Sequence, residues 1–242
     1  MTPNALMPFW VQGGTVPQRL AANLILDPSD SANYTLNSGN YEQIVNTGTW
    51  GGSVDQATAT LRPPQAVDYF GTGLHAVHPD DVDDIMDVTG SWDLWANAGA
   101  FTIFFVHYQV DQAHGGFMKM SGGDFLMNNT EHLRIYDSVA SSSKRIMEQA
   151  SYTTNTRSLT ELAATDPTTG AWSAIKVNGV DVTRIGGPST IPNDIGTIDS
   201  VYSTIPWPAG FRFGEILAWD RELTSGELTA VRDYLNTKWS IY

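Results

Sequence analysis

FGEILAWDRELTSGELTAVRDYLNTKWSIY, residues 213–242, carries the most informative pattern in the chain. Residues 211–219 predict a β-strand that places four apolar side chains on one side: Phe211, Phe213, Leu217 and Trp219. Thr224, followed three residues later by Glu227, forms a capping box, which predicts the start of a helix. Apolar residues then recur at helical spacing until the helix ends near Trp239: Leu228, Val231 and Leu235. A strand therefore leads into a helix whose apolar stripe must be buried against a neighbouring element.

Upstream of this segment, short strand patterns alternate with turn residues, which is typical of all-β proteins. Phe101–Val110 is the clearest strand. It is apolar on both faces, so we expect it to be central and covered on each side. Leu133–Tyr136 predicts another strand, and Trp172–Val177 runs into Asn178-Gly179, which predicts a hairpin. No repeat or linker marks a boundary, and we expect one domain.

The composition excludes several classes of protein. The 242 residues include 13 Lys and Arg against 26 Asp and Glu, a formal charge of −13, which argues against a nucleic-acid partner and against a basic membrane-surface protein. The absence of cysteine excludes disulfides and cysteine-based sites. The first residues, MTPNALMPFWVQGG, lack the basic and apolar regions of a signal peptide, and no apolar run is long enough to span a membrane.

The usual sequence signatures of catalysis are missing: G-x-S-x-G, H-E-x-x-H, the Walker A loop and G-x-G-x-x-G. Glycoside hydrolysis would need two carboxylates that flank the sugar bond. Glu215 lies on the strand, but Asp220 points the opposite way and Glu222 lies in a turn. We therefore expect no catalytic residues and a non-enzymatic protein. We expect Glu215 to pair with Arg221 near the strand–helix junction instead.

Two patterns suggest metal binding without defining a site. Five Asp residues fall within Asp80–Asp87, and hard cations such as Ca²⁺ prefer carboxylates. The spacing is not that of an EF-hand, so we expect a solvated acidic turn that is helical or irregular. The weak candidates for Ca²⁺ ligands are Asp80, Asp81, Asp83 and Asp84. His75 and His78 have the spacing of a helical metal pair, but Pro79 makes a helix doubtful. His107 is expected to be a half-buried, hydrogen-bonded side chain within a strand.

Aromatic residues supply the remaining candidates. Trp92 and Trp95 flank a turn-like stretch, where exposed rings could stack on sugars. The alternative, which we favour, is that they cover an open end of the fold. Residues 1–23 show little periodicity and predict an arm, in which Phe9 and Trp10 are the candidate residues for binding a partner. Three methionines are expected to fill the core: Met118, Met120 and Met127.

Three segments resemble, in order, the laminin-G-like, concanavalin-A-like jelly-roll domains found in bacteriophage virion proteins. Leu24–Pro64 resembles the opening of that family through LILDPSDSANYTLNSGNYEQIVNTGTWGG and VDQATATLRPP. FTIFFVHY at Phe101–Tyr108 is similar to its central strand. Residues 213–242 resemble its terminal EIL.YDR.LT..E…V..YL..KW.I motif at ten positions: Glu215, Asp220, Arg221, Leu223, Thr224, Glu227, Tyr234, Leu235, Lys238 and Trp239.

The resemblance implies a two-sheet antiparallel jelly-roll sandwich with a short C-terminal helix over residues 24–242, preceded by the arm. It also implies a non-enzymatic virion protein, made in the host cytoplasm without a signal peptide, that serves as a capsid or tail decoration or adhesion module. Its partners would be other virion proteins and host-surface glycans, and a homo-oligomer such as a trimer would suit that role. The alternative is a stand-alone lectin module or a polysaccharide-active glycoside hydrolase.

Overall fold

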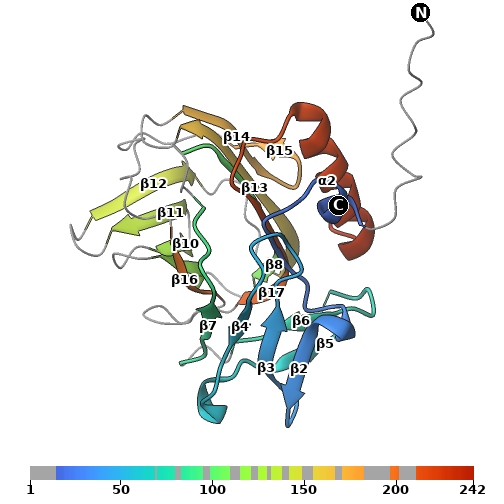
Figure 1. The fold of residues 1–242 in the computed structure, drawn as a ribbon. Coiled ribbons are helices and arrows are strands. Elements are labelled where there is room, and N and C mark those ends of the chain that lie inside the picture. The colour runs from blue at the N-terminus through green and yellow to red at the C-terminus, as the bar shows by residue number, and fades with distance from the viewer. Residues whose placement is uncertain are drawn as a thin grey trace, which may run out of the picture.

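The computed structural model describes residues 15–68, 70–79, 83–94, 99–109, 115–120, 125–129, 132–137, 142–148, 155–166, 171–182, 197–201 and 211–242. Within these ranges the chain forms two antiparallel β-sheets that face each other and a helix that covers the outer side of one of them (Figure 1). The predicted all-β jelly-roll sandwich with a C-terminal helix is confirmed.

The helix-side sheet contains eight of the described strands. Its central strand β8 (Phe101–Gln109) pairs with β13 (Thr156–Asp166) on one side and with β17 (Phe211–Trp219) on the other. The order is β15-β14-β13-β8-β17-β6-β5, with β1 also paired to β17. The remaining bounds are β1 Leu24–Leu26, β5 Gln65–Val67, β6 His75–Val77, β14 Ala171–Val177 and β15 Val180–Asp181.

The opposite sheet contains nine of the described strands, in the order β12-β11-β10-β9-β16-β7-β4-β3-β2. Two short 3₁₀ helices, Ser31–Asn33 and Ala59–Leu61, lie in the connections between strands. The strand bounds are β2 Tyr34–Asn37, β3 Asn40–Val45, β4 Ser53–Asp55, β7 Met86–Thr89, β9 Gly115–Met120, β10 Phe125–Asn129, β11 His132–Asp137, β12 Ser142–Glu148 and β16 Ile198–Val201.

The described residues form two hydrophobic cores, one on each face of the helix-side sheet. Alternate residues of β8 show this, because Phe101, Ile103 and Phe105 pack between the sheets. Phe104 and Val106 point the other way, toward the helix. β8 is therefore central and covered on both faces, as predicted. The core between the sheets also contains two of the three methionines expected there, Met118 and Met120, whereas the side chain of Met127 lies outside the described part of the structure.

β17 contains a β-bulge between Phe213 and Ile216, where three steps along β17 match two along β8. A bulge adds one residue to a strand and so reverses the side that later residues face. Phe213 and Ile216 consequently lie between the sheets, whereas Leu217 and Trp219 pack under the helix. The prediction that Phe213 shares a side with Leu217 and Trp219 is wrong for this reason. The side chain of Phe211 is not among those described.

The C-terminal helix α2 (Ser225–Trp239) begins at the predicted capping box. Thr224 Oγ1 accepts a hydrogen bond from the backbone N–H of Glu227, and the Glu227 carboxylate accepts one from the backbone N–H of Thr224. The predicted apolar stripe is buried against the helix-side sheet: Leu228, Val231, Leu235 and Trp239. Burial of that stripe fixes the helix on the sheet.

The segment before β1 is not an extended arm throughout. Residues 16–19 form the short helix α1 (Val16–Arg19), which lies beside α2 (Figure 1). Leu20 and Ala22 are buried in the core under α2. The prediction of an arm over residues 1–23 is therefore wrong for residues 15–23, because their apolar side chains help to close this core. Residues 1–14 lie outside the described part.

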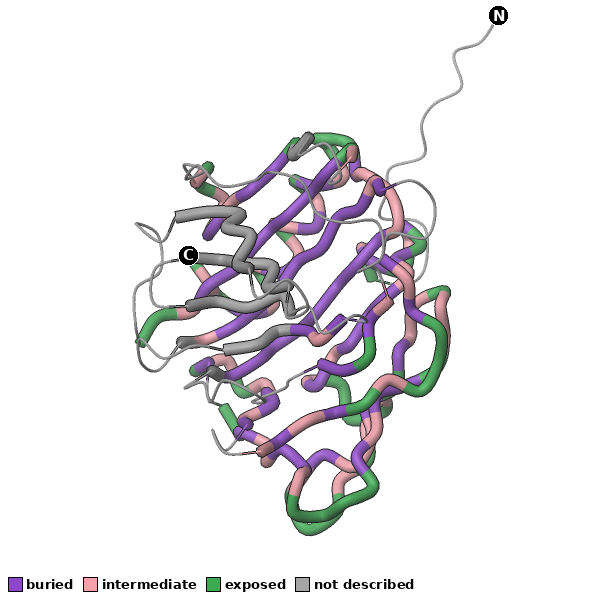
Figure 2. Tube along the Cα trace, turned by 90° about the vertical axis from the view of Figure 1, so that its left-hand side faces the viewer, coloured by how far each residue is buried: buried purple, intermediate pink, exposed green. Residues whose placement is uncertain are grey.

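Buried positions follow the long central strands of the sandwich, while exposed positions gather at its turns (Figure 2). One of these turns is the predicted Asn178-Gly179 hairpin between β14 and β15, where both residues adopt positive φ (52° and 76°). Among the described residues, no helix has the length and apolar character needed to span a membrane.

Candidate functional site

A cavity of about 280 Å³, lined mainly by residues with polar side chains, lies on the outward face of the opposite sheet. Ile44 on β3 and Val54 on β4 point into the core between the sheets. Their neighbours Gln43 and Asp55 therefore point outward, because successive side chains of a strand alternate between its faces. The cavity is lined by β2, β3, β4 and the loop that follows: Thr35, Glu42, Gln43, Asp55, Gln56 and Ala57.

A bulge in β3 adds a side chain to this cavity. Thr35 on β2 lies opposite Gln43, but Leu36 lies opposite Tyr41, so Glu42 is the extra residue. Glu42 and Gln43 both line the cavity although they are adjacent in sequence. Regular alternation would have turned Glu42 toward the core, where an unpaired carboxylate is costly.

Hydrogen bonds across the strands fix the floor of the cavity. The Ser53 hydroxyl donates to Asp55 Oδ2 at 2.9 Å and lies 2.7 Å from Thr89 Oγ1. Gln43 Nε2 lies 3.4 Å from Ser53 Oγ. Oδ1 of Asp55 is buried and has no hydrogen-bond partner in the described part of the chain. The floor is therefore a pre-arranged polar surface on which one carboxylate oxygen has no donor among the described residues.

Arg62, only 7% exposed, holds the rim of the cavity in place. Its Nη2 lies 2.6 Å from Glu42 Oε1, and its Nε donates to the carbonyl oxygen of Gln56 at 2.7 Å. Nη2 also donates to the carbonyl oxygen of Ala57 at 2.9 Å. This single guanidinium therefore connects β3 to the loop after β4 and leaves Glu42 partly exposed at the rim.

The cavity is acidic. Asp55 faces Asp87, its direct partner on β7, so two carboxylates stand opposite each other on the outward face.

Sequence reasoning missed the residues of this cavity because they come together only through the strand register. The pattern Asn40–Val45 gives no sign of the bulge that turns Glu42 outward. Chemically, the cavity can accept hydrogen bonds from hydroxyl and amino groups, and it disfavours anions.

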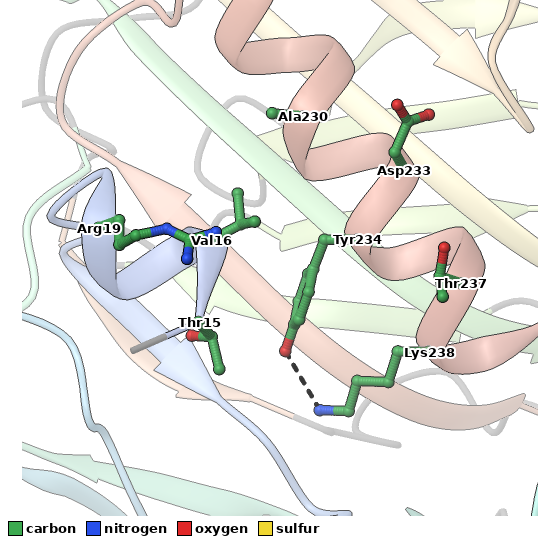
Figure 3. Close-up of a pocket in the computed structure, with 8 residues that line it drawn as sticks. All are labelled: Thr15, Val16, Arg19, Ala230, Asp233, Tyr234, Thr237 and Lys238. Carbon is green, nitrogen blue, oxygen red and sulfur yellow. Dashed lines mark hydrogen bonds between the residues drawn. The ribbon is translucent and has the colours of Figure 1, made fainter. Parts of the chain in front are cut away.

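A second cavity, an apolar groove of about 570 Å³, lies between α1 and α2 (Figure 3). Val16 and Arg19 line it from α1, while Ala230, Tyr234 and Lys238 line it from α2. Its exposed walls are predominantly apolar despite these residue types. Lys238 contributes its methylene stem and Tyr234 its ring, because their polar ends are engaged with a network behind the groove.

Glu215 is the centre of that network. It is 1% exposed and lies at the bulge of β17. Its carboxylate accepts hydrogen bonds from the Tyr234 hydroxyl at 3.1 Å, from Lys238 Nζ at 2.8 Å and from Trp239 Nε1 at 3.3 Å. Lys238 Nζ also contacts Asp27, just after β1. The network therefore joins the two ends of the domain through one half-buried ammonium group.

Burial dominates the proton affinities in this network. It raises the pKa of Glu215 to about 7, and the nearby Asp27 charge adds to the rise, while the Lys238 ammonium opposes it. Burial lowers the pKa of Lys238, but the Glu215 and Asp27 carboxylates outweigh that effect and raise it overall. Burial and the Glu215 charge raise the pKa of Tyr234. Lys238 therefore stays charged near neutral pH, whereas Glu215 titrates there.

The expected pairing of Glu215 with Arg221 is wrong. Arg221 forms a bidentate ion pair with Glu227, with distances of 3.0 and 2.9 Å. This pair and the Thr224 hydrogen bonds lower the pKa of Glu227 to about 2. Arg221 thus stabilises the start of α2, and Lys238 from the end of α2 is the partner of Glu215.

The structure rejects one of the two tryptophans considered for sugar stacking. Trp92 has no exposed surface, packs between the sheets, and donates from Nε1 to the carbonyl oxygen of Gly51 at 2.8 Å. A fully buried ring cannot stack on a sugar, so the glycan prediction is wrong for Trp92. Trp95 lies outside the described residues, as do Phe9 and Trp10, the candidates for binding a partner.

The metal candidates have a mixed outcome. Asp80 and Asp81 lie outside the described part, Asp83 is half-buried, and Asp84 is buried in an irregular segment that ends where β7 begins. Across the residues that are described, no group of three or more His, Asp or Glu side chains is placed to hold a metal ion. The Ca²⁺ prediction for the complete cluster stays a prediction.

The histidines have structural surroundings. His75 begins strand β6, so the prediction of a helical metal pair with His78 is wrong. The Nδ1 atom of His75 lies 2.9 Å from both the Tyr34 hydroxyl and Gln65 Nε2. His107 is fully buried rather than half-buried, and its Nε2 lies 3.0 Å from Thr160 Oγ1. Burial lowers the pKa of His107 to about 3, so its ring is neutral.

Two packed sheets with a covering helix define a β-sandwich of the jelly-roll type. The sequence matches no protein-family model and no curated protein. Among solved structures, the binding domain of botulinum neurotoxin serotype D is similar, with a TM-score of 0.55 and 11% identity over 88% of this chain and 51% of that chain. The binding domain of botulinum neurotoxin DC in complex with SialylT has a TM-score of 0.50 and 11% identity. That match covers 91% of this chain and 52% of the toxin domain.

Trypanosoma rangeli sialidase in complex with the inhibitor DANA gives a TM-score of 0.48 and 12% identity, and the match covers 86% of this chain and 32% of the sialidase. The chain thus spans about half the length of the toxin domains and about a third of the sialidase. At these identities the similarity to the toxin domains establishes the fold.

Proposed function

We propose that this protein is a non-enzymatic binding module that recognises a saccharide in the acidic cavity on the outward face of the opposite sheet. The observation that carries the proposal is the fixed polar floor of that cavity, in which Asp55 keeps one carboxylate oxygen without a donor among the residues that the structure describes. A sugar hydroxyl would supply the missing hydrogen bond, with a small adjustment of the loop after β4. Such an exchange favours binding because a buried, unpaired acceptor is costly.

The charge of the cavity favours neutral or amino sugars over acidic ones. Glu42 and Asp55 line it, Asp87 stands beside it, and the whole chain carries a formal charge of −13. A sialylated or uronic acid ligand would place a further negative charge among these groups. The neighbour bound to SialylT therefore supports saccharide binding by this fold, and the acidic cavity of this chain points to a different sugar class.

None of the six lining residues carries an aromatic ring, so one cavity would bind weakly. Several copies on one particle would overcome this, since linked sites gain avidity by roughly 10²–10⁴-fold. We further propose that the protein is such a repeated component, a decoration or adhesion module of a bacteriophage virion. This part rests on the resemblance of residues 213–242 to virion domains. Immunogold labelling of phage particles tests it, and unlabelled particles would reject it.

A glycan array tests the saccharide proposal, with the wild-type protein presented as multimers. The expected result is binding to neutral or amino glycans that Asp55→Asn weakens by about tenfold, the value of one charge-assisted hydrogen bond. Glu222→Gln is the matched control, because it removes one negative charge at a residue that does not line the cavity and should bind like the wild type. Selective binding of sialylated glycans, or equal loss in both variants, would reject the site. Release of oligosaccharides from a bound polysaccharide would reject the non-enzymatic role.

A further inference from the structure

The apolar groove between α1 and α2 has a wall pattern that none of the functions above uses. The buried stripe of α2 consists of positions 228, 231, 235 and 239, and a second stripe beside it lines the groove. That second stripe contains Ala230, Tyr234 and Lys238, at helical spacing (Figure 3). At about 570 Å³ the groove lies within the roughly 300–1,000 Å³ range of ligand-binding pockets.

The groove is apolar because the network behind it draws away the polar ends of its wall. Lys238 Nζ lies 2.8 Å from Glu215, and the Tyr234 hydroxyl lies 3.1 Å from the same carboxylate. What remains toward the groove is a methylene stem and an aromatic ring. Ala230 and Val16 add further carbon surface. The exposed wall is therefore mostly carbon and suits apolar side chains, although the charged residues Arg19 and Asp233 also line the groove.

The chain itself contains a segment of matching chemistry that ends at this groove. Residues 1–14, MTPNALMPFWVQGG, contain no charged side chain, and their apolar residues gather within Leu6–Val11. The segment joins Thr15, which lines the groove and begins α1 through a capping box with Gln18. The point from which the segment leaves is thus fixed at the rim of the groove.

The reach of the segment fits the groove. Five Cα-to-Cα steps lead from Trp10 to Thr15, which allows about 17 Å of extended chain. The stretch of α2 from Ala230 to Lys238 is about 12 Å long at the rise of an α-helix. A reversal at Gly13-Gly14 would let the segment lie along this stretch, since glycine adopts turn conformations without steric penalty. A tethered segment also has a millimolar effective concentration, which favours it over a second copy.

We propose that residues 6–11 of the same chain occupy the groove, with Phe9 and Trp10 as the anchoring side chains. The segment then covers Tyr234 and Lys238 and shields the Glu215 network from water. The ligand of the groove is an uncharged aromatic peptide, and a partner of the same chemistry would have to displace it.

Disulfide cross-linking in the full chain tests this proposal, because the protein has no cysteine of its own. Ala5→Cys combined with Ala230→Cys places one thiol on the segment and one in the groove. Ala5→Cys combined with Thr229→Cys is the control, because Thr229 is exposed on the same helix and does not line the groove. We expect the groove pair to oxidise at least about tenfold faster within one molecule, because the bound segment would hold its thiol close to the thiol in the groove and so raise their effective concentration.

Phe9→Ser with Trp10→Ser, added to both pairs, should abolish the difference in rate. Ala230→Cys alone should retain the wild-type unfolding midpoint, which shows that the groove variant folds. Equal rates for the two pairs would overturn the proposal, as would a difference that survives the two serine substitutions. Disulfide-linked dimers from the groove pair would also overturn it, because the occupant would then be the segment of a second copy.

Discussion

Lys238→Met should destabilise the protein in a strongly pH-dependent way. The substitution keeps the methylene stem along α2 but removes the ammonium group that lies 2.8 Å from Glu215 and contacts Asp27. Near pH 8 Glu215 is largely ionised, because its pKa in the folded protein is about 7. The variant must then either bury that carboxylate without its counter-charge or take up a proton at a pH where the wild type is ionised. Removing one partner of a buried ion pair typically lowers the free energy of unfolding by about 3–5 kcal/mol.

The loss should shrink as the pH falls. Without the Lys238 ammonium the pKa of Glu215 rises further, because that charge opposes the effect of burial. Well below neutral pH Glu215 is therefore protonated in the variant, and no uncompensated charge remains at this position. What persists is the lost contact with Asp27, about 2 kcal/mol for a hydrogen bond between charged groups.

Urea unfolding followed by tryptophan fluorescence measures the loss in the free energy of unfolding at each pH, provided that the m-value stays constant. The two measurements are made one pH unit above and about two pH units below the Glu215 pKa. Lys238→Met with Glu215→Gln is the control. At the higher pH the double variant should be more stable than Lys238→Met alone, because the stranded charge is gone. An equal loss at both pH values would refute the argument, since the ionisation of Glu215 would then play no part.

Three further outcomes are expected. The Glu215 contribution to stability should fall as the pH rises from about 4.5 to 7, by at most about 1.4 kcal/mol per pH unit, because the pKa of Glu215 is raised on folding. Buried His107, whose pKa is lowered on folding, contributes a slope of opposite sign below about pH 6.5, so the difference between wild type and Glu215→Gln in urea titrations isolates the Glu215 part. Trp92→Ala should lower the free energy of unfolding by about 3–5 kcal/mol, and unchanged thermal stability would contradict its burial. Gly48→Ala should lower the melting temperature, since its Cβ would lie 2.4 Å from the Asn23 carbonyl oxygen; an unaltered melting curve would show that the loop yields.

Elements set by local sequence could be predicted well. The capping box at Thr224 and the helical spacing after it gave α2, because both signals act within a few residues. The two apolar faces of Phe101–Val110 gave the central position of β8, since only a strand covered on each side buries both. Asn178-Gly179 gave the β14–β15 hairpin for the same local reason.

Features that depend on register could not be predicted. Nothing in residues 211–219 distinguishes a regular strand from one with a bulge, so the side that Phe213 faces was assigned wrongly. The acidic cavity depends on Asp55 standing opposite both Gln43 and Asp87, which are distant in sequence. The partner of Glu215 was wrong because Lys238 approaches it from the far end of α2.

Asn46 shows the same limit at a loop. Its side chain is 4% exposed, and Oδ1 accepts hydrogen bonds from the backbone N–H groups of Ile25 and Gly48, each at 2.8 Å. Nδ2 donates to the carbonyl oxygens of Asn23 and Gly51. One amide thus fastens the loop after β3 to β1. In the sequence it is only a polar residue before Thr-Gly, and its role depends on contacts formed after folding.

The bulge of β17 has a consequence for how this fold can change in length. Before the bulge β17 pairs with β6 at Phe213, and after it with β1 at Ile216, so the extra residue also marks where one neighbour replaces another. Loss of Gly214 would exchange the inward and outward side chains of every later residue in the strand. A side chain at Gly214 would also place its Cβ 2.7 Å from Val106. Insertions, deletions and grafted sequence should therefore be tolerated in the surface loops long before they are tolerated at this position.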